Sequence, residues 1–330
     1  MKLRRILKDS GPTVQAQGQS GWVQLDRIED LSTIGGVLGT TNNLSDDVLS
    51  VLALGPVGWS ALAERVDQLE SDDDGSTEPI LPFAPASFRD FMLFEDHVIA
   101  ASRGYARRFM PWSFPVTQAI EFITRKPMNV FRPHRLWYQQ PIYYLSNHLN
   151  IVVSGTPITW PRYSSALDYE LELGAVLAHP LHNATAEEAH RAIGGFVVLN
   201  DFSARDVQKE EMDSGFGPQK AKHFASSISS TIVTADEVLA SIDQLNATVE
   251  INGHVVAQCR SEGMHHSLAE AIAFASQGEK LFPGELFGSG TFPGGTGIEN
   301  GAWLRPEDDL RLTIDRVGSV QNMIREEAAP

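Results

Sequence analysis

Residues 167–178 read LDYELELGAVLA, and this alternation of acidic and apolar side chains predicts a β-strand. Because successive side chains of a strand point to opposite faces, Asp168, Glu170 and Glu172 lie on one face. Three acids in a row repel one another unless solvent surrounds them or a hard divalent cation binds them. Taken alone, the stretch favours a solvated strand face over a metal site.

Two further segments bring acids toward this strand. The apolar stretch GFVVLN at residues 195–200 leads directly into Asp201, which places another acid at a strand end. Upstream, Asp90 and His97 are seven residues apart, which is two turns if this segment is helical. A histidine near a carboxylate-bound metal can act as a general base at neutral pH. The acid at the strand end favours the metal site, whereas the segment that holds His97, taken alone, favours an ordinary surface helix.

The remaining patterns predict a β-rich α+β fold. Extended segments dominate beyond residue 140, and the pair Asn252-Gly253 between two of them predicts a hairpin. Thr185 and Ser267 each precede a glutamate by three residues, and these capping boxes predict the starts of two helices. Strands and helices do not alternate regularly, which excludes a doubly wound sheet.

The polar stretch SDDDGSTEP at residues 71–79 predicts a linker. We expect it to separate a small mixed domain, residues 1–75, from a catalytic domain, residues 80–330. In the first domain, Ser45 is expected to cap a helix that ends at Gly55-Pro56. A second helix is expected to present one apolar face, formed by Trp59, Leu62, Val66 and Leu69.

Composition limits the possible partners. The 330 residues hold 26 Lys and Arg against 42 Asp and Glu, which gives a formal net charge of −16. Such a surface repels a phosphate backbone, so we expect no nucleic-acid partner. No stretch is apolar enough for a membrane span, and the start MKLRRILKDSG lacks the apolar core of a signal peptide. We therefore expect no membrane partner and a cytoplasmic location.

Four motifs resemble, in order, the core of the fumarylacetoacetate hydrolase (fumarylacetoacetase) superfamily. They are DYELELG (168–174), NDFSARDVQKEEM (200–212), GPQKAKHFASSIS (217–229) and GSGTFPGGTG (288–297). The resemblance implies a mixed β-roll of the fumarylacetoacetase C-terminal type with a small N-terminal domain. It also implies a divalent metal ion, Mg²⁺ or Ca²⁺ and in some members Mn²⁺, and a homodimer.

The same resemblance implies a role for individual residues. The implied metal ligands are Asp90, Glu170, Glu172 and Asp201. The implied catalytic residues are His97, Glu299, Lys222 and Gln208. The implied substrate contacts are Tyr144, Thr291 and Arg103.

Two of these assignments have alternatives, and Asp168 becomes an outer or structural acid. The acid that orients His97 is either Glu299 or Glu95, and the cation for a substrate carboxylate comes from Arg103, Arg107 or Arg108.

Together, the acids and the resemblance predict a divalent-metal-dependent hydrolase. Its expected substrate is a small 1,3-diketo acid of the fumarylacetoacetate or acylpyruvate type, in which it cleaves a carbon–carbon bond. A divalent ion would stabilise the enolate leaving group, while His97 activates water and Lys222 and Gln208 stabilise the oxyanion. The alternatives in the same superfamily are a decarboxylase of an oxaloacetate-like β-keto acid and a hydratase or tautomerase of an oxo-dienoate. The alternative of another class is a non-catalytic protein that binds a metal and carboxylates.

Overall fold

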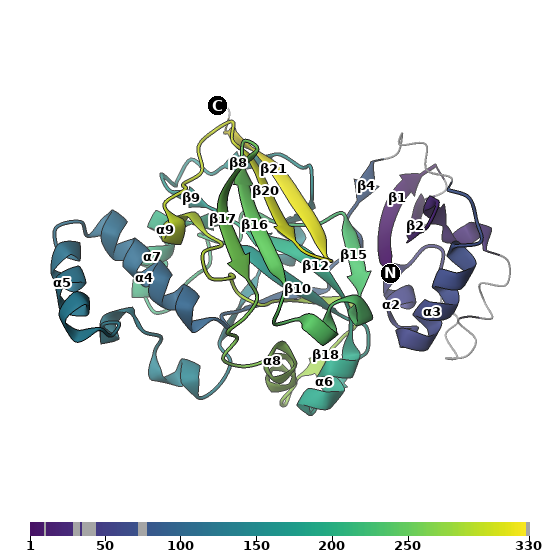
Figure 1. Ribbon diagram of the computed structural model, residues 1–330, viewed down its shortest axis with the longest axis horizontal. Helices are drawn as coiled ribbons and strands as arrows, with labels where there is room; N and C mark the ends of the chain where they lie inside the picture. The colour runs from purple at the N-terminus through teal and green to yellow at the C-terminus, as the bar shows by residue number, and fades with distance from the viewer. Residues whose placement is uncertain (10, 29–33, 35–43, 72–77, 328–330) are drawn as a thin grey trace.

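A computed structural model of the chain describes residues 1–9, 11–28, 34, 44–71 and 78–327 (Figure 1). Over these residues the largest sheet has 12 strands. The order along its main path is β3 (Gly21–Gln24), β2 (Gly11–Gly18), β1 (Lys2–Lys8), β15 (Thr231–Thr234), β12 (Ile193–Asp201), β10 (Leu171–Leu177), β19 (Glu285–Gly288), β5 (Ser87–Phe91) and β6 (Tyr143–Ser146). The strands off this path are β4 (Pro79–Ile80), which pairs with β1, and β14 (Ser226–Ile228), which joins β12 to β7 (Ile151–Val153).

A second sheet packs on the first through contacts of its β20 and β21 with β12. Its strands are, in order, β17 (His254–Arg260), β16 (Asn246–Ile251), β20 (Asp309–Ile314), β21 (Gly318–Glu326) and β8 (Ile158–Trp160). Two short pairs complete the described strands: β9 (Leu167–Asp168) with β13 (Ser203–Ala204), and β11 (Leu181–His182) with β18 (Lys280–Leu281).

Helices surround the two sheets and do not alternate with the strands. The described α-helices are α2 (Val48–Leu52), α3 (Gly55–Val66), α4 (Glu95–Phe109), α5 (Phe114–Thr124), α6 (Ala186–Ala192), α7 (Arg205–Asp213), α8 (Leu268–Ala275) and α9 (Gly297–Asn300). Figure 1 shows α2 and α3 beside β1 and β2 at one end of the molecule, and α4 and α5 at the other. This arrangement confirms the β-rich α+β fold that the sequence predicts.

The core lies between the two sheets, and its central strands carry acids. Every residue of β10 and β12 is buried, because strands flank both and the second sheet covers the larger one. Asp168, Glu170 and Glu172 are only 0%, 5% and 1% exposed. The prediction of a solvated strand face, which the alternation alone favoured, is therefore wrong. The acids need partners within the protein or a bound cation.

Local signals were accurate where the pattern spans few residues. The Asn252-Gly253 hairpin is confirmed, because Ile251 pairs with His254 where β16 turns into β17. Both capping boxes are confirmed at the starts of α6 and α8, where Thr185 and Ser267 accept a hydrogen bond from the backbone N–H three residues on.

The N-terminal helices begin differently from the prediction. Asp47, and not Ser45, caps α2: its carboxylate accepts hydrogen bonds from the backbone N–H groups of Leu49 and Ser50 at 3.1 and 3.2 Å. The capping residue is the one that directly precedes the first turn, and Ser45 lies too far upstream. In α3 the buried face comprises Trp59, Leu62 and Val66, while Leu69 lies beyond the helix end.

The division into domains 1–75 and 80–330 stays a prediction, and residues 72–77 of the expected linker lie outside the described residues. Strand β1 pairs with β2, β4 and β15, so the first strands of the chain continue the large sheet. Across the described part of the chain, no helix is both long and apolar enough to cross a membrane.

Candidate active site

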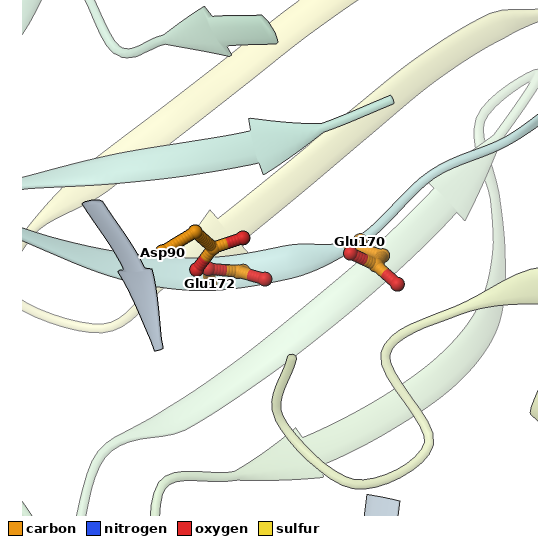
Figure 2. A group of neighbouring side chains, drawn as sticks. All are labelled: Asp90, Glu170 and Glu172. Carbon is orange, nitrogen blue, oxygen red and sulfur yellow. The ribbon is translucent and has the colours of Figure 1, made fainter. Parts of the chain in front are cut away.

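Three acids from adjacent segments form a buried carboxylate cluster. β10 pairs with β19, and β19 pairs in parallel with β5, so that Gly288 faces both Gly174 and Asp90 in register. This register places Asp90 beside Glu172 of β10, with Glu170 at the entry to the same strand (Figure 2). One carboxylate oxygen of each acid lies within 4.8 Å of the other two.

A glycine leaves the space for this approach. A Cβ atom on Gly288 would lie 2.7 Å from Oε2 of Glu172 and closer still to Oδ1 of Asp90. Contacts this short do not occur, so a larger residue would push the two carboxylates apart. The GSG segment that begins at Gly288 also supplies the backbone N–H of Gly290, which donates to Oε2 of Glu172 at 3.2 Å.

The cluster is electrostatically unbalanced on the side of Asp90 and Glu172. Burial, followed by repulsion from Asp201, raises the pKa of Asp90 to about 8. Burial, followed by repulsion from Asp90, holds the pKa of Glu172 well above its usual range. Oδ1 of Asp90 is buried and has no hydrogen-bond partner. An acceptor oxygen of this kind calls for a proton or a cation.

Glu170 is in the opposite situation, because two cations neutralise it. Nζ of Lys222 donates to its Oε2, and Nη2 of Arg205 lies 2.7 Å from its Oε1. Although burial opposes the charge, Lys222 and then Arg205 lower the pKa of Glu170 to about 2. Glu170 is therefore ionised at neutral pH.

The donor set fits a hard divalent cation. Three carboxylates converge, one oxygen is unpartnered, and a glycine replaces the side chain that would fill the space between two of them. Asp90, Glu170 and Glu172 are the residues that would hold such an ion, in agreement with three of the four predicted ligands.

The fourth predicted ligand, Asp201, lies next to this cluster with other partners. Its Oδ2 accepts hydrogen bonds from Nζ of Lys222 at 2.7 Å and from the hydroxyl of Tyr144. Its Oδ1 accepts from the hydroxyl of Ser226 at 2.9 Å. Asp201 stays a predicted ligand, one that would exchange a hydrogen bond for a metal ion.

His97 forms a close pair with Glu299. Nδ1–H of His97 donates to Oε1 of Glu299 over 2.6 Å, and Oε2 of Glu299 accepts from the backbone N–H of Gly294 at 2.8 Å. Glu95, the alternative partner, instead accepts a hydrogen bond from the hydroxyl of Tyr138 at 2.5 Å. The structure therefore brings Glu299, and not Glu95, to the imidazole.

Asp90 and His97 do not share a helix, so the condition for a spacing of two helical turns is not met. Asp90 belongs to strand β5, and α4 begins only at Glu95, after Phe94 as N-cap. The apolar stretch between the two residues turns the chain from the sheet edge into the helix. His97 consequently lies in the first turn of α4.

The remaining predicted residues lie at different distances from the cluster. The hydroxyl of Thr291 is 3.4 Å from Oε1 of Glu172, and Tyr144 reaches Asp201. Oε1 of Gln208 accepts from the hydroxyl of Tyr105 at 2.8 Å. Gln208 also accepts from Arg205 at 2.9 Å, so this amide joins the cluster through an arginine.

The three arginines of α4 are engaged elsewhere. Arg103 binds Glu121 of α5 with two hydrogen bonds of 3.0 Å, so the structure does not bring it to the carboxylate cluster. Nη2 of Arg107 donates to the backbone carbonyls of Ile298 and Glu299, and Arg108 lies over the ring of Trp303, 4.0 Å from its centre.

Arg205 is a further residue of this site that was not predicted from the sequence. It is 2% exposed and donates to Asp168 at 2.8 Å, to Thr296 at 2.8 Å and to Gln208, in addition to its contact with Glu170. The signal available in the sequence was a cation four residues after Asp201, in a motif that begins at the end of a buried strand. Arg205 links the carboxylate cluster to the segment that carries Glu299.

Sequence comparison agrees with the motifs. The family model described as fumarylacetoacetate (FAA) hydrolase C-terminal matches residues 124–325. A fumarylacetoacetase from Dictyostelium discoideum is 26% identical over 350 residues, covering 89% of this chain and 80% of that protein. An oxaloacetate tautomerase from Bacillus subtilis is 28% identical over 181 residues, covering 54% of this chain and 58% of that protein.

Solved structures show the same fold at low identity. A fumarylacetoacetate hydrolase from Exiguobacterium antarcticum matches with a TM-score of 0.68 at 18% identity, over 99% of this chain and 100% of that chain. A 5-carboxymethyl-2-hydroxymuconate delta-isomerase from Mycobacterium smegmatis matches with a TM-score of 0.65 at 18% identity, over the same shares. These likenesses confirm the fold that the motifs imply.

Divalent-metal binding should release protons below pH 8. With a pKa of about 8, Asp90 carries a proton at neutral pH in the metal-free protein, and an incoming cation must displace it. Because this pKa is raised from 3.8, protonated Asp90 stabilises the metal-free fold at low pH and loses that effect as the pH rises through 8. Metal affinity should therefore rise between about pH 6 and pH 8. Calorimetric titration with Mn²⁺ in buffers of different ionisation enthalpy measures the released protons, and a Kd independent of pH would contradict this expectation.

Gly288→Ala should weaken Mn²⁺ binding by about tenfold or more, because the added methyl group separates the carboxylates of Asp90 and Glu172. Calorimetric titration gives the Kd, and circular dichroism with thermal unfolding shows whether the variant is folded. A folded variant with unchanged Mn²⁺ affinity would show that the ion does not bind between these two acids.

Proposed function

The chain belongs to the fumarylacetoacetate hydrolase family, and from this premise we propose that it is a divalent-metal-dependent hydrolase that cleaves a carbon–carbon bond in a 1,3-diketo acid. We propose a substrate of the fumarylacetoacetate or acylpyruvate type. The observation that carries this proposal is the contact between His97 and Glu299, which supplies a base for water next to a cluster of metal-ligand acids.

Carbon–carbon hydrolysis requires a leaving carbanion that is delocalised as an enolate. A divalent ion bound by Asp90, Glu170 and Glu172 would supply Lewis acidity toward the two oxygens of a 1,3-dicarbonyl group. The burial of these acids excludes water that would otherwise weaken the electrostatic interaction with substrate.

His97 is assigned the role of general base. Glu299 accepts a hydrogen bond from Nδ1–H of His97. The other ring nitrogen, Nε2, is therefore the basic one that takes a proton from water. Glu299 fixes this tautomer and stabilises the imidazolium that forms. The N–H of Gly294 in turn holds the Glu299 carboxylate.

Lys222 and Gln208 are assigned to the oxyanion that develops on the attacked carbonyl. The ammonium group of Lys222 has three N–H donors, of which Glu170 and Asp201 accept two. Gln208 accepts with its oxygen from Tyr105 and Arg205, so its NH₂ group is the end that it can offer to substrate. Preorganised donors of this kind stabilise negative charge in a buried site.

Tyr144 and Thr291 are assigned to substrate binding, because each hydroxyl lies next to an acid of the site. Arg103 is left out of this assignment since Glu121 already binds its guanidinium. A homodimer, a cytoplasmic location, and a choice of Mg²⁺, Ca²⁺ or Mn²⁺ stay predictions.

The alternative is tautomerisation or decarboxylation of an oxaloacetate-like β-keto acid. An oxaloacetate tautomerase from Bacillus subtilis is 28% identical over 54% of this chain. Another from Xenopus laevis is 29% identical over 56% of this chain. Such reactions share the enolate and need no activated water. The His97–Glu299 pair therefore favours the hydrolase.

His97→Ala should lower kcat for acylpyruvate hydrolysis by about 10²–10⁴-fold, which is the usual contribution of a positioned general base. The affinity for Mn²⁺ should not change, because the group that could hold the ion comprises Asp90, Glu170 and Glu172 and does not include His97. Single-substrate kinetics with acylpyruvates, fumarylacetoacetate and oxaloacetate would measure this. A variant that keeps full hydrolytic turnover would exclude the proposed role of His97.

Glu299→Gln and Glu95→Gln form a matched pair that tests the orienting acid. Glu299→Gln should approach the defect of His97→Ala, because a neutral amide stabilises the imidazolium poorly. Glu95→Gln should keep near-normal kcat, since Glu95 binds Tyr138 and not the imidazole. Equal defects in the two variants, or a larger one in Glu95→Gln, would reverse the assignment.

A further inference from the structure

The two members of the His97–Glu299 pair lie on helices α4 and α9, which pack against each other. Helix α9 has only four residues, Gly297–Asn300. A single helical turn is unstable in water by itself. Fixing the backbone of the first turn costs entropy, and a helix this short forms no further hydrogen bonds that would offset this cost. Surrounding residues must therefore fix the position of Glu299.

The N-terminal side of α9 is held by a buried acid. The carboxylate of Asp168 accepts hydrogen bonds from the backbone N–H groups of Gly297 and Ile298 at 2.8 and 3.0 Å. The same carboxylate also accepts hydrogen bonds from the hydroxyl of Thr296 at 2.6 Å and from Nε–H of Arg205 at 2.8 Å. Asp168 therefore ties this end of α9 to the short strand β9 and to Arg205.

The other side of α9 is held by α4 itself. Nη2 of Arg107 donates to the carbonyl oxygens of Ile298 and Glu299 at 3.1 and 3.2 Å, which are carbonyls that so short a helix leaves without helical partners. A Cβ atom on Gly104 would lie 2.9 Å from the carbonyl carbon of Ile298 and closer still to its oxygen. Only glycine allows this approach between the two helices.

Gly104 makes its contact from the face of α4 that presents His97. Gly104 follows His97 by seven residues, which is close to two turns, and both are buried. Arg107 extends from the adjacent, exposed side of the helix and reaches over the end of α9.

We propose that Gly104 and Arg107 are positioning residues that set the separation between His97 and Glu299. Gly104 lets α9 approach α4, and Arg107 holds the backbone of Glu299 at the distance that this approach permits. The sequence had left Arg107 as a candidate cation for the substrate carboxylate, and the geometry points to α9 as its partner instead. The effect on turnover rests on the proposed hydrolase function, whereas the effect on the imidazole does not.

The test compares Arg107→Gln with Arg108→Gln in the full-length protein. The two arginines are adjacent and exposed, but Arg108 contacts the ring of Trp303 and not α9. Arg107→Gln should lower kcat for acylpyruvate hydrolysis by about tenfold, because small misplacements of a catalytic group cost factors of this order, and should leave KM within about twofold. Arg107→Lys should recover part of kcat, since an ammonium group can also donate to a carbonyl. Arg108→Gln should behave as the unmodified protein.

The readout that is independent of activity is the downfield proton NMR signal of the imidazole N–H that His97 donates to Glu299. In the metal-free protein this signal should weaken or shift in Arg107→Gln and disappear in Gly104→Ala, while it stays unchanged in Arg108→Gln. Gly104→Ala should also lower kcat by about 100-fold. Thermal unfolding identifies any variant that has lost its fold, and Arg107→Gln is the decisive variant because it changes an exposed side chain.

Two results would overturn the proposal. A raised KM with unchanged kcat in Arg107→Gln would show that Arg107 binds substrate. An unchanged imidazole signal in both Arg107→Gln and Gly104→Ala would show that these two residues do not set the separation between His97 and Glu299. If the unmodified protein does not hydrolyse any diketo acid, the proposed function fails, and the NMR comparison still decides the role of Gly104 and Arg107.

Discussion

Like charges are buried together at the centre of this protein. Five acids on or next to its inner strands are almost completely buried: Asp90, Asp168, Glu170, Glu172 and Asp201. The buried cations that contact them among the described residues are Arg205 and Lys222, and both lie on the side of Glu170, Asp168 and Asp201. Unpaired buried carboxylates are costly, so the excess negative charge around Asp90 and Glu172 needs either protons or a cation. A divalent cation bound between these acids would remove this imbalance.

The fold serves this site by bringing distant segments together. Strand register aligns β5 with β10 through β19, which ends at Gly288. The chain after β12 supplies Arg205 at the start of α7 and Lys222 ahead of β14, and both contact the acids. The short helix α9, held between Asp168 and α4, then delivers Glu299 to His97. Strands therefore fix the clustered acids, while side-chain contacts from several elements fix Glu299 beside His97.

The sequence was informative where a feature depends on neighbouring residues. Alternation identified the acids of β10, and short motifs located the hairpin at Asn252-Gly253 and both capping boxes. It could not show that the acidic face is buried, because burial depends on a second sheet formed by distant strands. For the same reason, a choice between Glu95 and Glu299 depended on tertiary contacts 202 residues apart. The seven-residue spacing also left open whether Asp90 shares the helix of His97, and nothing in the sequence indicated that Arg103 binds Glu121.

A crystal structure of the protein soaked with Mn²⁺ would show whether the three clustered acids hold a divalent ion. An anomalous difference map should show one strong peak, with an oxygen of each of Asp90, Glu170 and Glu172 at about 2.0–2.6 Å, the range of hard divalent cations. A map with no peak between these carboxylates, at saturating Mn²⁺ and above pH 8, would contradict the account.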